Sequence, residues 1–157
     1  LRIQSMASVH ELIYKQEMFE ALDFQSYLDR LLTSIQSYST DQKVVISAET
    51  NVDKLNIKTL IPVGITINEL VTNSLKYAFN EDSTNAPEIK LEIVEDGVDT
   101  FKMMYRDNGS GFLQERNNES FGIELIETVI EQVNGTIKQQ STPDWKNTLE
   151  IRFKEIN

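Results

Sequence analysis

The chain has 157 residues, of which 39% are hydrophobic and 25% charged, a composition typical of one globular domain with or without a helical appendage. It contains no cysteine and one histidine, His10, which excludes disulfide scaffolds, cysteine nucleophiles and multi-histidine zinc sites. With 25 acidic and 15 basic residues the net charge is -10, which disfavours nucleic acid as a main partner. A small anion can still be bound by backbone N–H groups, a metal ion or one lysine.

The apolar runs are too short for a transmembrane helix, and we expect no membrane contact by this chain. The sequence opens on Leu1-Arg2-Ile3-Gln4, with neither a methionine nor a secretory signal. We therefore expect a fragment of a longer protein.

Apolar residues at helical spacing predict a helix over residues 1–15 and a second over 23–35, with Asp23 as its N-cap. The first helix is apolar over too wide an arc to be buried by one neighbouring helix. We therefore expect a helical interface between two chains, lined by Ile3, Met6, Ile13 and Leu31. Docking of these side chains on the rest of the same chain is the alternative.

The rest of the chain alternates between β-branched or apolar runs and turn residues, which predicts strands at 43–49, 88–95, 100–106, 136–140 and 147–154 and helices at 59–79 and 122–133. Thr59 is the expected N-cap of the long helix, and Pro62 is tolerated in its first turn. Asp96-Gly97 is a hairpin turn signal, and Asn134-Gly135 ends the last helix. Adjacent strands joined by tight turns predict an antiparallel or mixed sheet with helices on one face. The predicted fold class is α+β.

The segment 68–79 places three polar side chains on one face of the long helix, because Glu69, Asn73 and Lys76 are spaced i, i+4 and i+7. The carboxamide oxygen of Asn73 is a hard ligand that suits Mg²⁺. Glu69 can hold a metal-bound water or accept a proton, and Lys76 can meet a phosphate. The segment taken alone favours the alternative of an ordinary solvated helix face.

A second motif, residues 106–112, follows a predicted strand directly. Its two glycines, Gly109 and Gly111, allow close approach of the backbone to a ligand, and Asp107 at the strand end can accept a hydrogen bond from an exocyclic amine. A tight surface turn is the alternative, since Asp-Asn-Gly is common in turns.

A third motif, residues 120–126, leads from a loop into a helix. Gly122 at the helix N-terminus leaves N–H groups free for a phosphate, with help from the helix dipole. Taken alone, it favours the alternative of a plain N-cap by Ser120.

In their order and placement, the three motifs resemble the N, G1 and G2 boxes of the histidine-kinase-like ATPase superfamily, over residues 40–157. The resemblance implies the Bergerat fold, a two-layer α/β sandwich that holds ATP and Mg²⁺. It implies Asn73 as the metal ligand and Asp107 as the acceptor for the adenine amino group. The implied catalytic residues are Glu69, Asn73 and Lys76. The implied nucleotide-binding residues are Asn73, Lys76, Tyr77, Asp107, Gly109, Gly111, Phe112, Gly122, Ile123 and Thr148.

The helices at the start of the chain and the segment 60–79 resemble the HisKA_2-type sensor kinases. This implies that 1–38 is the end of a dimerisation and phosphotransfer region, preceding a catalytic domain at 39–157. Such a domain transfers the γ-phosphoryl group of ATP to a histidine on an upstream helix, so we expect His10 to be packed and the fragment alone not to phosphorylate itself. Glu69 departs from the pattern, because many sensor kinases have Asn there and hydrolysing members have Glu.

The resemblance also implies partners: ATP, the upstream phosphoacceptor helix, a response-regulator receiver domain and a second copy of the chain bound through the N-terminal helices. It implies a cytoplasmic domain, whether or not the full-length protein is attached to a membrane. Two alternatives stay open. One is an ATPase or an anti-sigma-factor-type serine kinase of the same superfamily, and the other is a nucleotide-sensing module without catalysis.

Overall fold

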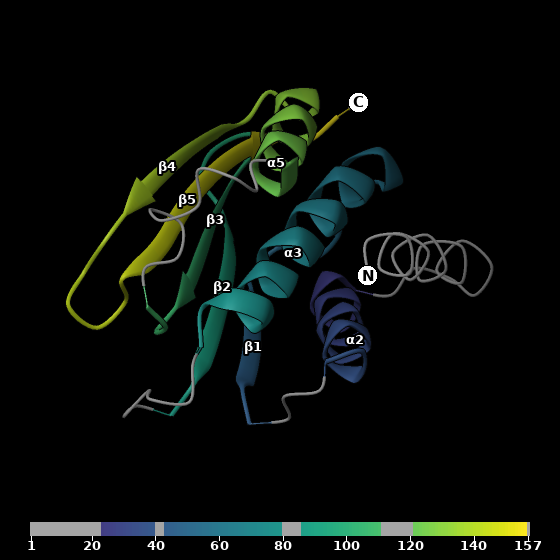
Figure 1. Ribbon diagram of the computed structural model, residues 1–157. Coiled ribbons are helices and arrows are strands. Elements are labelled where there is room, and N and C mark those ends of the chain that lie inside the picture. Colours follow the sequence, from purple (N-terminus) through teal and green to yellow (C-terminus); the bar gives the residue numbers. More distant parts are fainter. Residues whose placement is uncertain (1–22, 40–42, 80–85, 111–120, 157) are drawn as a thin grey trace.

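The computed structural model describes residues 23–39, 43–79, 86–110 and 121–156, without the side chains of 121–123. Figure 1 shows its elements, which in chain order are α2 (Phe24–Ser37), β1 (Val45–Thr50), α3 (Ile57–Tyr77), β2 (Glu88–Glu95), β3 (Thr100–Asp107), α5 (Phe121–Gln132), β4 (Thr136–Gln140) and β5 (Asn147–Lys154). Within those ranges, no helix combines the length and the hydropathy that crossing a bilayer requires.

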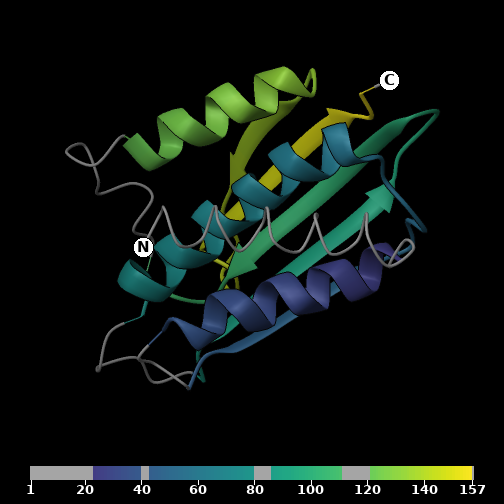
Figure 2. The same ribbon diagram turned by 90° about the vertical axis from the view of Figure 1, so that its right-hand side faces the viewer.

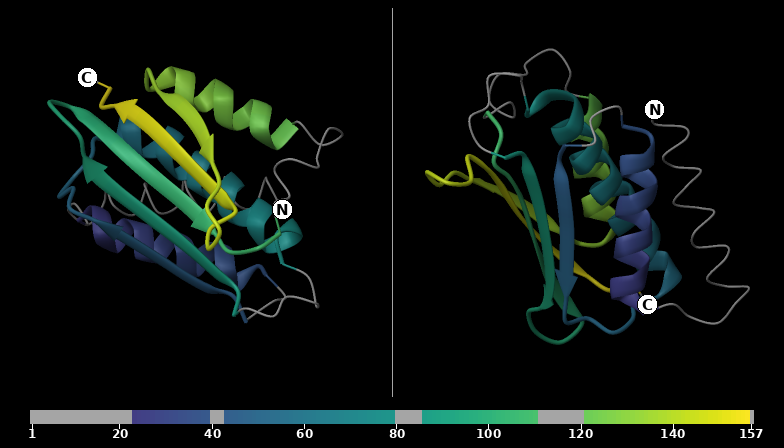
Figure 3. Two further views of the ribbon diagram at one scale, coloured as in Figure 1. Left: turned by 90° about the vertical axis from the view of Figure 1, so that its left-hand side faces the viewer. Right: turned by 90° about the horizontal axis from the view of Figure 1, so that it is seen from below.

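The strands form one five-stranded sheet in the order β1-β2-β3-β5-β4. β1 runs parallel to β2, and the other neighbouring pairs are antiparallel. The three described helices lie side by side on one face of this sheet, with α3 between α2 and α5 (Figures 1 and 2), and a view along the layers shows the strands on one side and the helices on the other (Figure 3, right). The prediction of an α+β fold with two layers is confirmed.

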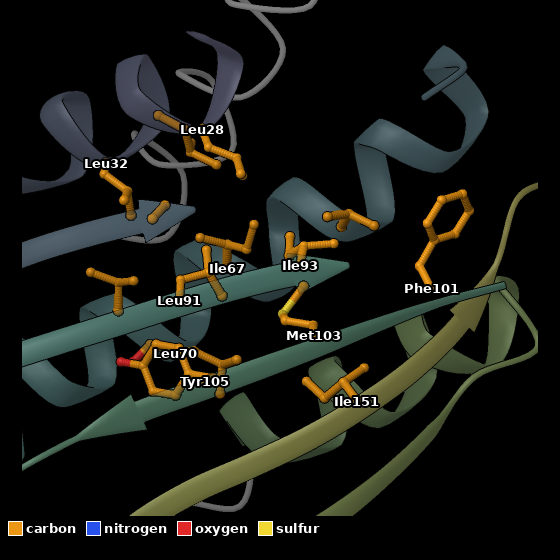
Figure 4. Packing of buried hydrophobic residues seen from close by; sticks show 14 of the residues in the cluster. Leu28, Leu32, Ile67, Leu70, Leu91, Ile93, Phe101, Met103, Tyr105 and Ile151 are labelled. Carbon is orange, nitrogen blue, oxygen red and sulfur yellow. The ribbon is translucent and has the colours of Figure 1, made fainter. Parts of the chain in front are cut away.

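Alternation along β3 decides which of its side chains meet the helices. Phe101, Met103 and Tyr105 are buried, whereas the residues between them are only half-buried on the opposite face. Figure 4 shows Met103 and Tyr105 packed with Ile67 and Leu70 of α3 in the hydrophobic core. The same alternation puts the last residue of β3, Asp107, on the helix side of the sheet.

Helix α2 belongs to this core, because its apolar face packs against the sheet. Leu31 is 0% exposed, so the prediction that it lines an interface between two chains is wrong and the alternative of docking within the chain holds for this residue. Ile3, Met6 and Ile13 lie outside the described residues. Two glutamines of α2 also cover the free edge of β1: Gln25 bonds Ala48 O and Thr50 N, and Gln36 donates to Val44 O.

Helix α3 begins earlier than predicted. Its N-cap is Asn56, whose side chain accepts hydrogen bonds from the backbone N and the hydroxyl of Thr59, so the prediction of Thr59 as the cap is wrong. Pro62 consequently lies beyond the first turn, inside the helix. The same cap holds the end of the chain, because Asn56 Nδ2 donates to Ile156 O and Ile156 N donates to Thr59 Oγ1.

We expect Asn56→Ala to lower the free energy of unfolding by about 2 kcal/mol, since it removes both an N-cap and the bond to the C-terminal segment. Urea unfolding of the 157-residue chain measures the effect. Asp23→Ala is the matched control, because Asp23 caps α2 through one side-chain bond to Ser26 N and its side chain bonds no other segment among the described residues. Equal losses in the two variants would contradict the role assigned to the C-terminal contact.

Candidate functional site

The centre of the candidate site is the carboxylate of Asp107, which is fully buried at the end of β3. Its Oδ2 accepts a hydrogen bond from Ser74 Oγ on α3 at 2.6 Å. Its Oδ1 accepts from Asn147 Nδ2 on β5 at 2.8 Å and from the backbone N of Gly109 at 3.0 Å. Three donors from a helix, a neighbouring strand and the following loop therefore meet at one carboxylate.

Burial is the main influence on the acidity of this group. It raises the pKa of Asp107 above its ordinary value, and the hydrogen bonds from Ser74, Asn147 and Gly109 oppose the shift without cancelling it. An acceptor held in this way, away from water, is suited to recognising a ligand N–H group, because that hydrogen bond does not compete with solvent.

Ser74 is itself held by a buried tyrosine. Tyr105 Oη lies 2.5 Å from Ser74 Oγ and 3.0 Å from Leu70 O, so its one proton is directed to these two acceptors, and Ser74 keeps its own proton for Asp107. Burial and the nearby charge of Asp107 raise the pKa of Tyr105 well above its ordinary value, so its hydroxyl keeps its proton. Figure 4 shows the Tyr105 ring beside Leu70, and this contact fixes α3 on β3 next to the site.

The loop after β3 is docked on the end of α3. Ser110 N donates to Ala78 O at 2.8 Å, and a Cβ atom added to Gly109 would lie 2.2 Å from the same carbonyl oxygen. A backbone oxygen cannot move aside as a flexible side chain can, so only glycine fits at this position. The close approach gives a physical reason for one glycine of the second motif.

The three residues predicted on one face of α3 follow a path from the core to the surface. Glu69 is 2% exposed, Asn73 is half-buried and Lys76 is exposed. Tyr77, also half-buried, completes the same end of the helix. Because Asn73 precedes Ser74, its carboxamide is on the stretch of α3 that adjoins Asp107. The amide oxygen of Asn73, half-buried one helical turn after the buried carboxylate of Glu69, is a hard ligand that fits Mg²⁺ and its waters.

The other predicted site residues are only partly placed. Gly111 and Phe112 lie outside the described residues. Gly122 and Ile123 belong to the first turn of α5, as the third motif predicts for a helix start, and their side chains are not described.

Thr148 does not lie where its predicted role requires. It pairs with Arg106, so its side chain is on the face of the sheet opposite to Asp107, where its hydroxyl donates to Trp145 O. Asn147 is the residue of β5 that pairs with Asp107 and contacts it. Sequence reasoning missed Asn147, because the register between β3 and β5 decides which of two adjacent residues meets the site.

The chain is similar to known proteins both in sequence and in fold. Residues 1–39 match the model of the HisKA_2 family, described as histidine kinase, and none of the curated proteins matches the chain. The histidine kinase domain of the Erythrobacter litoralis EL346 blue-light activated histidine kinase is similar over 99% of this chain and 75% of that one, with a TM-score of 0.82 and 13% identity. The fold is that of a histidine-kinase ATP-binding domain.

Other histidine kinases share this fold. The ATP-binding domain of PrrB from Mycobacterium tuberculosis matches 87% of this chain and 96% of that one at 17% identity, with a TM-score of 0.62. Acinetobacter baumannii AdeS matches 99% and 77% at 14% identity, with a TM-score of 0.63. The chain spans about half, 53%, of a longer chain of the EL346 kinase.

The prediction from the sequence motifs agrees with both comparisons: residues 1–39 are similar to the HisKA_2 histidine kinases, and the fold is that of histidine-kinase ATP-binding domains. The comparisons favour neither of the alternatives, and the roles of single residues stay predictions.

The raised pKa of Asp107 in this histidine-kinase fold gives a pH-dependent prediction. The folded state holds the proton more tightly than the unfolded state, so the contribution of Asp107 to stability falls as pH rises from its ordinary value, 3.8, through its folded value. We therefore expect the free energy of unfolding of the wild type to fall relative to that of Asp107→Asn over this window. Urea unfolding at a series of pH values measures the difference. A wild type that gains on the variant as pH rises would mean that the three donors outweigh burial.

Proposed function

We propose that the chain is the catalytic domain that binds Mg·ATP in a sensor histidine kinase and transfers its γ-phosphoryl group to a histidine on an upstream helix. One observation carries the proposal: the buried carboxylate of Asp107, fixed by α3, β5 and the glycine loop at the end of the sheet. An acceptor so placed fits the exocyclic amine of adenine.

Asn73 and Lys76 are the groups that would hold the phosphate end of the nucleotide. The amide oxygen of Asn73 would be the protein ligand of Mg²⁺, which when bound supplies positive charge against the phosphate oxygens. Lys76, exposed at the end of α3, would neutralise a further phosphate charge, and Tyr77 and Gly109 would border the nucleotide. The buried Glu69 lies one helical turn before Asn73, where it would orient a metal-bound water.

The remaining contacts of the proposal involve the glycine-bearing loop, the start of α5 and an upstream helix. Gly111, Phe112, Gly122 and Ile123 would cover the nucleotide. The acceptor histidine would lie upstream of this chain, with His10 as a packed residue, and the reaction would break the bond between the γ-phosphorus and ADP and form a phosphorus–nitrogen bond. Positioning and charge neutralisation supply most of such catalysis. A second copy of the chain and a receiver domain would be its partners, in the cytoplasm.

We expect Asn73→Ala to weaken Mg·ATP binding by about ten- to a hundredfold, because a hard oxygen ligand is lost. Without magnesium, the variant and the wild type should bind ATP equally, since Asn73 acts through the metal. Isothermal titration with and without Mg²⁺ measures both effects.

The matched control for that experiment is Asn51→Ala, which makes the same change at an asparagine bonded to Glu95 N, at the opposite end of β2 from Asp107. The full-length kinase carrying Asn73→Ala should also lose acid-labile phosphohistidine. If Asn73→Ala bound Mg·ATP as tightly as the wild type, Asn73 would not be the metal ligand.

Asp107 should select ATP over GTP. Guanine presents an oxygen where adenine presents its amine, and two acceptors facing each other in a buried site cost about 1–3 kcal/mol, or roughly ten- to a hundredfold in affinity. Competition of the two nucleotides for the wild-type chain measures the ratio. Equal affinities would rule out that Asp107 recognises adenine, and the proposed function would lose its main support.

A further inference from the structure

The side chain of Asn147 carries more hydrogen-bonding capacity than its contact with Asp107 uses. It is 1% exposed, and its Nδ2 donates to Asp107 Oδ1 at 2.8 Å and to Ser110 O at 3.4 Å. Both of these partners are acceptors, so a flipped amide would bring its oxygen against a carboxylate and a carbonyl. The chemistry of the neighbours therefore fixes which end of the amide is oxygen.

The oxygen of that amide, in contrast, has no hydrogen-bond donor within the described part of the chain. Asn147 Oδ1 is buried and accepts no hydrogen bond among the described residues. A buried acceptor without a donor destabilises the protein that carries it, and a native structure that keeps one has a reason to do so. If the only task of residue 147 were to hold Asp107, a donor alone would suffice, and the carboxamide oxygen would be an uncompensated cost.

The carboxylate beside it also has capacity left. Oδ2 of Asp107 accepts one hydrogen bond, from Ser74, and an ionised carboxylate oxygen accepts two. One unpaired acceptor, Asn147 Oδ1, and one acceptor with remaining capacity, Asp107 Oδ2, thus belong to side chains that are bonded to each other. A ligand that satisfies both must present two N–H groups close together, and a primary amine on an aromatic ring is such a group.

We propose that Asn147 is a specificity-determining residue of the nucleotide site, whose Oδ1 accepts the second N–H of the adenine 6-amino group while Asp107 accepts the first. This inference rests on the proposed function and deepens it. The site would then read a primary amine, not simply the presence of one N–H donor. A purine with a secondary amine at the same position would satisfy Asp107 and leave Asn147 without a donor.

N6-methyl-ATP tests the proposal, because it keeps one N–H of the amine and replaces the other by a methyl group. We expect the wild-type chain to bind ATP roughly tenfold more tightly than N6-methyl-ATP, the effect of one hydrogen bond to a buried acceptor. Asn147→Ala should bind the two nucleotides equally. Asn147→Ser is the second variant, since its hydroxyl can still donate to Asp107 while the amide oxygen is gone, and it should also lose the discrimination.

Ser74→Ala is the matched control. It removes a different donor to Asp107 and leaves Asn147 unchanged, so it should weaken both nucleotides while keeping their ratio. A variant that merely disturbs Asp107 would behave like Ser74→Ala, which separates recognition by Asn147 from support of its neighbour. Thermal unfolding of each variant checks that the fold is retained.

The outcomes separate the two proposals. A wild-type chain that binds no ATP overturns the proposed function and this inference together. A wild type that binds ATP and N6-methyl-ATP equally overturns the inference alone. Discrimination that persists in both Asn147 variants means that the methyl group is excluded by shape, and it also overturns the inference.

Discussion

The architecture of this domain around its candidate site depends on keeping one carboxylate out of water. Asp107 is ionisable and fully buried, and a buried charge is tolerated only when donors surround it. Those donors come from Ser74 on α3, Asn147 on β5 and the backbone of Gly109. A displacement of the helix, the strand or the loop therefore removes a partner from the carboxylate, so the three segments are positioned together.

Most of the fold could be predicted from the sequence, because the strands and helices have clear periodicity and are bounded by turn residues. The failures have local causes. Asn56 and Thr59 are both good capping residues three positions apart, and the apolar pattern of α3 is compatible with either start. The end of α5 was predicted correctly. Asn134, two residues after the helix, has φ of 49°, a left-handed conformation that asparagine tolerates and few other residues do.

The candidate site was predictable only where its residues form motifs along the chain. Asp107 and Gly109 belong to such a motif. Asn147 and Thr148 are adjacent, and the period of two in a strand means that one of them faces the helices and the other faces away. The sequence contains no signal for the register between β3 and β5, so a likeness to known kinases selected the threonine and the structure selects the asparagine as the neighbour of Asp107.

The end of the family match does not coincide with the edge of the packed domain, because α2 belongs to both. The family match ends at residue 39, and the resemblance likewise assigned 1–38 to a dimerisation region. Yet α2 buries Leu28 and Leu31 in the same core as α3 and β2, and its glutamines satisfy the outer edge of β1. A helix bound by both apolar burial and edge hydrogen bonds cannot swing freely relative to the sheet. The family boundary at residue 39 therefore falls inside one packed unit, and α2 belongs structurally with the sheet that carries Asp107.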